Sequence, residues 1–144
     1  MKRLAFVLGS TLLMVTMLAT PALAAAQKVD LVRAAAFPTV PGGGSVVFNN
    51  SAGPRNLEVT VVLKGVTPNT AYDVWVYVDV TGPGTKIGTV TTNGAGNATL
   101  HVNTAVASGT HNLGVDVVYM GSMSDVYLTA GFYGPGMSAT LTFK

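Results

Sequence analysis

Hydrophobic and polar residues alternate along most of the chain, from about residue 28 to the C-terminus. Strict alternation is typical of a half-buried strand, because neighbouring side chains point to opposite faces of a sheet. Valine and threonine, which favour strands, are abundant in these segments, and no window keeps a helical period. The pattern predicts about nine strands, over residues 28–35, 45–49, 56–65, 71–80, 85–92, 97–104, 110–119, 125–132 and 137–143.

Glycine, proline and asparagine stand between these runs and predict turns, because glycine adopts positive φ and proline presets a turn. The Asn93-Gly94 pair lies between two strand patterns and is the strongest hairpin signal in the chain. One apolar face per strand implies two antiparallel sheets packed on a common core. We therefore predict an all-β fold, a sandwich or a small barrel, as a single domain over residues 25–144.

The first 24 residues have the features of a secretory signal peptide. Lys2 and Arg3 precede an apolar stretch over residues 4–18, and small residues at Ala22 and Ala24 mark a cleavage site. The apolar stretch is shorter than the roughly 20 residues that span a bilayer. We expect residues 1–24 to be removed and the mature chain not to span a membrane. A periplasmic, a cell-surface and an extracellular location all remain open, and the leader and composition suggest a bacterial origin.

Charge and cysteine content exclude several classes of protein. Without the leader the chain has six basic and six acidic residues, so its net charge is zero. Nucleic-acid binding needs clustered cations, so we expect no nucleic-acid partner. The absence of cysteine excludes disulfides, a thiolate metal site and a cysteine nucleophile.

The segment 66–76, Val-Thr-Pro-Asn-Thr-Ala-Tyr-Asp-Val-Trp-Val, resembles the loop-and-strand signature of fibronectin type III and related immunoglobulin-like modules. The resemblance implies an antiparallel immunoglobulin-like β-sandwich of about seven to nine strands. It also implies that Tyr72 forms a tyrosine corner, with its hydroxyl bonded to nearby backbone. In fibronectin modules this strand is next to last, whereas about 65 residues follow it here, so the strand order must differ. The stretch 88–99 is similar to hairpins of bacterial secreted immunoglobulin-like domains.

The polar phase of the strand predicted over residues 71–80 carries the most suggestive side chains. Trp75 and Tyr77 lie between Asp73 and Asp79, opposite the valines of the same strand. Two aromatic rings flanked by carboxylates suit sugar stacking or protein docking. Tyr127 and Tyr133 have the polar phase of the strand predicted over 125–132 and its end, and would extend this face. The alternative is that a loop or a neighbouring strand covers the aromatic residues.

The residues that catalysis or metal binding would need are few. His101 and His111 are the only histidines, and both are expected at the solvated surface. A Ser124, His101 and Asp116 set can be composed, but no G-x-S-x-G motif positions the serine. Zinc is coordinated by three or four nitrogen, sulfur or carboxylate ligands, and calcium by clustered oxygen atoms. Asp79 near the 81–85 loop, and Asp125 near Ser122 and Ser124, are possible calcium ligands. Because no D-x-D-x-D-G run occurs and too few histidines are present for zinc, we expect no metal, no cofactor and no catalytic site.

Two classes of function remain. The first is an exported, non-catalytic structural or interaction module of the cell envelope or extracellular matrix. It would bind a polysaccharide or a protein through Trp75 and Tyr77, or self-associate through a sheet edge, with segments 28–35 and 137–143 as the candidate edges. The alternative is a secreted hydrolase, or a small-ligand or metal-binding protein, on the same scaffold, since one fold hosts many functions.

Overall fold

The computed structural model describes residues 26–50, 53–79, 83–132 and 139–144. The expected leader, residues 1–24, lies outside these ranges, as does Tyr133. In the described ranges no helix is long and apolar enough to cross a membrane. The regular structure there consists of β1 (Gln27–Arg33), β2 (Gly43–Asn49), β3 (Asn56–Lys64), β4 (Ala71–Val78), β5 (Thr85–Thr91), β6 (Ala98–Ala105), β7 (Gly109–Tyr119), β8 (Ser124–Thr129) and β9 (Ala139–Phe143).

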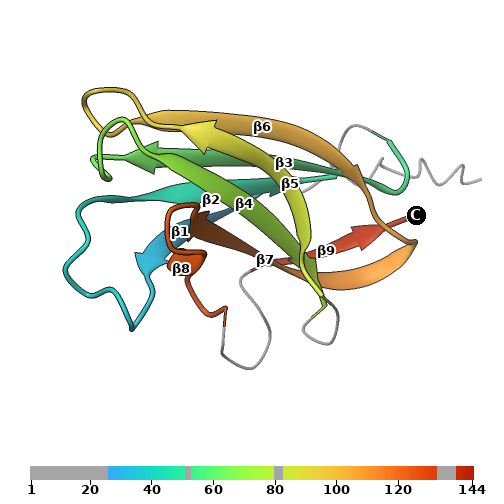
Figure 1. The fold of residues 1–144 in the computed structure, drawn as a ribbon. Coiled ribbons are helices and arrows are strands. Elements are labelled where there is room, and N and C mark those ends of the chain that lie inside the picture. Colours follow the sequence, from blue (N-terminus) through green and yellow to red (C-terminus); the bar gives the residue numbers. More distant parts are fainter. Residues whose placement is uncertain (1–25, 51–52, 80–82, 133–138) are drawn as a thin grey trace, which may run out of the picture.

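The nine predicted strands are confirmed, with ends within about three residues of the predicted ones. All pairings are antiparallel, and the strands follow the order β5-β4-β7-β8-β1-β2-β3-β6, with β9 beside the first half of β7. The sheet curls until β5 and β6, its two end strands, lie side by side (Figure 1). The fold is therefore all-β, with a nearly barrel-shaped antiparallel sheet.

One continuous sheet replaces the two separate sheets that the sequence predicted. Three residue pairs between β1 and β8, from Leu31–Thr129 to Arg33–Tyr127, join the two halves. Consequently β1 lies between β8 and β2, and the prediction of segment 28–35 as a free edge is wrong. Sequence order does not determine spatial order, because a terminal strand can pair on both sides once the chain folds back over it.

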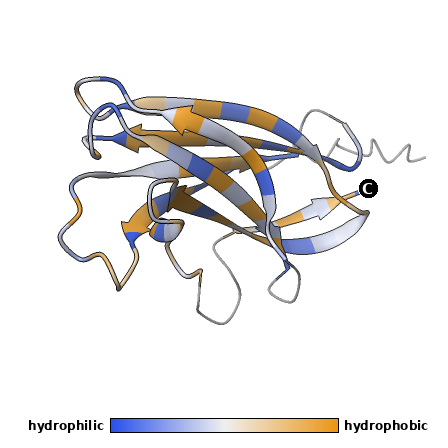
Figure 2. Cartoon of the chain, viewed as in Figure 1, coloured by the Kyte–Doolittle hydropathy of each residue, from blue (hydrophilic) through white to orange (hydrophobic). Residues whose placement is uncertain are grey.

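The core fills the inside of the curled sheet. Hydrophobic and polar positions alternate along the strands (Figure 2), and the apolar positions meet in one cluster. Burying a valine, leucine or phenylalanine side chain completely stabilises the fold by roughly 1.5–3 kcal/mol relative to leaving it exposed. Tyr119, predicted in the apolar phase of its strand, is 41% exposed. The predicted inward faces are otherwise confirmed at the buried positions Leu57, Val59, Val61, Leu63, Tyr72, Val74, Val76, Leu113, Val115, Val117, Leu141 and Phe143.

The Asn93 turn is not a hairpin, although the sequence predicted one. β5 pairs with β4 and β6 pairs with β3, and no ladder joins β5 to β6 in the described chain. The Asn93 side-chain oxygen instead accepts from the backbone N–H groups of Ala95 and Asn97, at 2.9 and 3.0 Å. The turn thus carries the chain from one half of the sheet to the other.

Candidate functional site

The polar phase of β4 lies on the face of the sheet that points away from the core, here called the outer face. Asp73 stands opposite Val118 of β7, Trp75 opposite Asp116 and Tyr77 opposite Gly114. The intervening residues of β4 belong to the core cluster. The period-two pattern of this strand therefore assigned its two faces as the structure has them.

Asp73 is already engaged on this face. Its carboxylate binds the Lys86 ammonium at 2.8 Å and accepts a 2.6 Å hydrogen bond from the Thr89 hydroxyl, both on β5. The Lys86 hydrogen bond, then the Thr89 one, hold the pKa of Asp73 below its ordinary value. Because the Asp73 side chain is only 7% exposed, its main role is to fasten β5 to β4.

The two aromatic residues of β4 differ in their surroundings. The Tyr77 ring stands edge-on to Phe132, with centroids 5.0 Å apart, and lies directly on the backbone of Gly84. Trp75 is partly exposed, and among the described residues no aromatic ring packs against it. Trp75 is therefore the ring of this strand that is positioned for stacking, and Tyr77 supports the surface beside it.

Tyr127 faces the core, so the expectation that it extends the aromatic face is wrong. β7 and β8 change register between Val117 and Val118, which leaves Val126 as an extra residue in β8. This bulge turns both Val126 and Tyr127 inward. Tyr127 is fully buried, its hydroxyl donates to the Pro41 carbonyl, and burial raises its pKa to about 12. A bulge shifts the alternation of a strand by one residue, and the sequence pattern does not predict where a bulge occurs.

The same bulge brings Asp125 to the outer face, beside Asp116. Asp116 stands next to Trp75 in one ladder and next to Leu128 in the other, and only 3% of it is exposed. Burial, followed by the hydrogen bond and the charge of Asp125, raises the pKa of Asp116 to about 8. The alternation in sequence had placed Asp116 in the polar phase of its strand, but it did not predict that Asp116 is buried or that Asp125 lies beside it. The overlooked signal is a single acidic residue in the middle of an otherwise apolar strand, Leu-Gly-Val-Asp-Val-Val.

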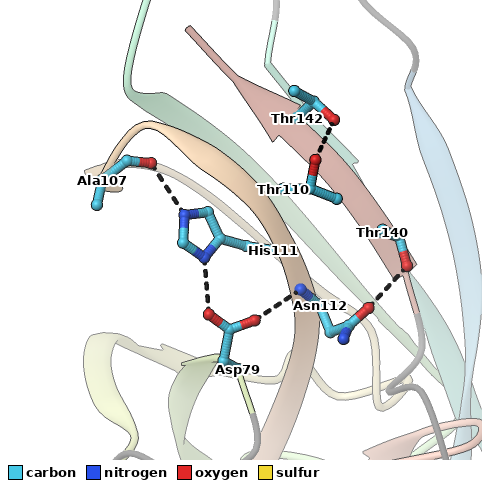
Figure 3. A network of polar contacts seen from close by, with 7 residues as sticks. All are labelled: Asp79, Ala107, Thr110, His111, Asn112, Thr140 and Thr142. Atoms are coloured by element: carbon cyan, nitrogen blue, oxygen red, sulfur yellow. Dashed lines mark hydrogen bonds and ion pairs between the residues drawn. The ribbon is translucent and has the colours of Figure 1, made fainter.

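Asp79 does not join the Trp75 surface but binds His111 (Figure 3). The Asp79 carboxylate accepts from His111 Nδ1 at 2.7 Å and from the backbone N–H of Asn112 at 3.0 Å. His111 Nε2 lies 3.1 Å from the Ala107 carbonyl. With acceptors at both nitrogens, the imidazolium is the form that satisfies every contact. The Asp79 hydrogen bond accordingly raises the pKa of His111, and the His111 hydrogen bond lowers that of Asp79.

His111 is therefore not the solvated histidine that the sequence suggested, since its side chain is only 15% exposed. His101 is more exposed and lies on β6, where it contacts Glu58 at 3.2 Å and Thr60 at 2.8 Å on β3. β6 and β7, the strands of His101 and Asp116, are not neighbours in the sheet, so the conceivable set with Ser124 is not assembled. In the part of the chain that the structure describes, no group of three or more acidic, histidine or cysteine residues comes together.

The His111–Asp79 pair predicts a measurable pH dependence of stability. A histidine with a raised folded-state pKa stabilises the fold fully at pH values below its ordinary pKa of 6.5. This contribution is lost as the pH rises through the raised pKa. The Asp79 contribution is present above 3.8 and fades as the pH falls through its lowered pKa. His111→Gln should therefore lower the free energy of unfolding most between pH 3.8 and pH 6.5, where both contributions are present. The loss should be only about 1 kcal/mol, because Asp79 is half exposed and solvent screens the pair.

Urea unfolding of wild type and His111→Gln at several pH values measures this effect. His101→Gln, which alters the more exposed histidine, serves as the control and should change stability little at any of them. Equal losses for His111→Gln at acidic and alkaline pH would contradict the ion pair and leave only packing of the ring.

No family model, curated protein or solved structure matches the chain.

Proposed function

We propose that the chain is an exported, non-catalytic module acting in a bacterial cell envelope or extracellular matrix, a variant of the immunoglobulin-like sandwich in which the β1–β8 pairing joins the two sheets into one. Its ligand on this proposal is a polysaccharide, held on the outer face of β4, β7 and β8. The observation that carries the proposal is the position of Trp75, partly exposed on the face opposite the core with ionisable groups on both sides.

The chemistry around Trp75 suits a sugar. An indole ring offers an apolar face to the C–H groups of a pyranose, and charged side chains at its rim hydrogen-bond to the hydroxyls. Lys86 of β5 lies across one ladder from Trp75, and its side chain is 42% exposed. Asp116 lies across the other ladder, with the exposed Asp125 beyond it. The accessible Lys86 ammonium and the exposed Asp125 carboxylate thus offer a donor and an acceptor on opposite sides of the ring.

The alternative of self-association through a sheet edge has less support. β1 is internal, and β9 already has its outward backbone groups engaged. The Gln27 side-chain amide donates to the Thr140 carbonyl at 2.6 Å and accepts from the Thr140 N–H at 3.1 Å, and the Asn50 amide donates to the Thr142 carbonyl. Side-chain amides thus occupy positions that another strand would need, which discourages edge-to-edge pairing. We expect a monomer in light scattering at every concentration.

Fluorescence of the mature protein with a panel of cell-wall polysaccharides tests the proposal, because Trp75 is the only tryptophan. We expect one polysaccharide to shift or quench the emission. Trp75→Ala should weaken retention on that polysaccharide at least about tenfold, the cost of removing a central aromatic contact. Trp75→Phe should give an intermediate loss, a gradation that a folding defect would not produce.

His101→Ala is the matched control, because it truncates an exposed ring on β6, in the half of the sheet that lacks Trp75. It should retain full binding. Emission unaffected by every polysaccharide, with equal retention of wild type and Trp75→Ala, would overturn the proposal.

A further inference from the structure

A β-bulge positions the second carboxylate of an acidic pair, the exposed Asp125 beside the buried Asp116. Without the extra residue Val126, regular alternation back from Leu128 would turn Asp125 toward the core. With it, Asp125 pairs with Val118 and shares the outer face with Asp116. Bulges often re-aim a side chain next to a functional site. The local backbone thus departs from a regular ladder at the point where it brings two carboxylates together.

Asp116 has an oxygen without a partner. Only 3% of the residue is exposed, and its Oδ1 atom is buried with no hydrogen-bond partner among the described residues. Such an atom costs free energy unless a water, an ion or a ligand meets it. Lys86, the base that faces this surface from β5, is bound to Asp73 at 2.8 Å. Among the described residues, no ion pair involves Asp116 or Asp125.

We propose that Asp116 and Asp125 bind a divalent cation, Ca²⁺ before Mg²⁺, on the outer face beside Trp75. Carboxylate oxygens are the ligands that these hard cations prefer. Ca²⁺ accepts irregular geometry and mono- or bidentate carboxylates, whereas Mg²⁺ demands a near-ideal octahedron. Two carboxylates leave several coordination positions to water or to ligand hydroxyls, so the affinity should be low, in the range of extracellular calcium modules, roughly 10⁻⁴–10⁻³ M.

The position of Trp75 provides a direct assay. Tb³⁺ replaces Ca²⁺ at sites made of oxygen ligands, and it luminesces when a nearby excited tryptophan transfers energy to it. Trp75 lies opposite Asp116 in the β4–β7 ladder and is therefore placed to sensitise Tb³⁺ bound there. Titration of the mature protein with Tb³⁺, without polysaccharide, should give a saturable luminescence that Ca²⁺ competes away. Asp116→Asn and Asp125→Asn should each weaken the apparent affinity roughly tenfold or more, because each removes a carboxylate that would be ionised when the cation is bound.

Two control variants distinguish binding at this pair from non-specific binding of Tb³⁺ to surface carboxylates. Glu58→Gln removes a carboxylate of β3 that contacts His101, and it should leave the titration unchanged. Trp75→Phe should abolish the luminescence but keep the Ca²⁺-dependent rise in unfolding temperature, which Asp116→Asn should lose. Circular dichroism confirms that the variants are folded.

Luminescence that does not saturate, or that survives in both aspartate variants, would overturn the cation site, as would an unfolding temperature insensitive to Ca²⁺. The acidic pair would then hold a shared proton alone. Because no polysaccharide is present, failure here is independent of the carbohydrate proposal, which the fluorescence panel tests separately.

Discussion

Asp116→Asn is expected to stabilise the protein above pH 8 and to flatten its pH profile. The folded-state pKa of Asp116 is about 8, against an ordinary value of 3.8, so the folded protein binds a proton that the unfolded chain releases. Stability therefore falls as the pH rises from about 4 to about 8. The loss should reach a few kcal/mol, since each pKa unit corresponds to about 1.4 kcal/mol. Asparagine keeps the shape of the side chain and carries no charge, so it avoids this loss.

Urea unfolding across this range, with a chelator present, measures the profile. Wild type should lose stability steadily toward alkaline pH, and Asp116→Asn should lose much less and overtake it. Asp30→Asn is the control, because Asp30 is an exposed aspartate of β1, and its profile should run parallel to that of wild type. Parallel profiles for all three proteins would show that Asp116 is ionised in the fold at neutral pH.

The strands and most of their faces were predictable because they follow from local chemistry. In β3, alternating apolar residues from Leu57 to Leu63 place the same side chains in the core that the pattern assigned. The pleat forces this result wherever a strand is regular and one face is buried. Trp75 was assigned to the outer face for the same reason.

The remaining features depend on long-range geometry. The bulge at Val126 puts Tyr127 and Asp125 on opposite faces of the sheet, and an extra residue in one strand is defined only against its partner, β7. His111 meets Asp79 across 32 positions in sequence. The continuous sheet depends on the short β1–β8 ladder. Periodicity reports the faces of each strand, but it carries no information about which strands are neighbours.

Gly96→Ala is expected to be among the most destabilising single-methyl changes in the chain. Gly96 adopts a φ of +73°, and a Cβ there would lie 2.0 Å from the Val66 carbonyl oxygen. The contact cannot relax cheaply, because the Val66 N–H donates to the Gly96 carbonyl at 3.0 Å and holds the two backbones together. The left-handed conformation adds about 1–2 kcal/mol for a residue with a side chain. The total should be roughly 3 kcal/mol or more.

Gly94 offers a matched control two residues away in the same turn. A Cβ at Gly94 meets nothing within 4 Å, so Gly94→Ala should change the free energy of unfolding by no more than about 0.5 kcal/mol. Urea unfolding of both variants makes the comparison. The Asn93 turn carries the chain between the halves of the sheet, and its backbone contact with Val66 fixes it to the β3–β4 connection. A large loss of stability for Gly96→Ala alone would therefore show that the Asn93 turn supports closure of the curled sheet. Equal, small losses for both variants would mean that the turn can change shape without affecting the sheet.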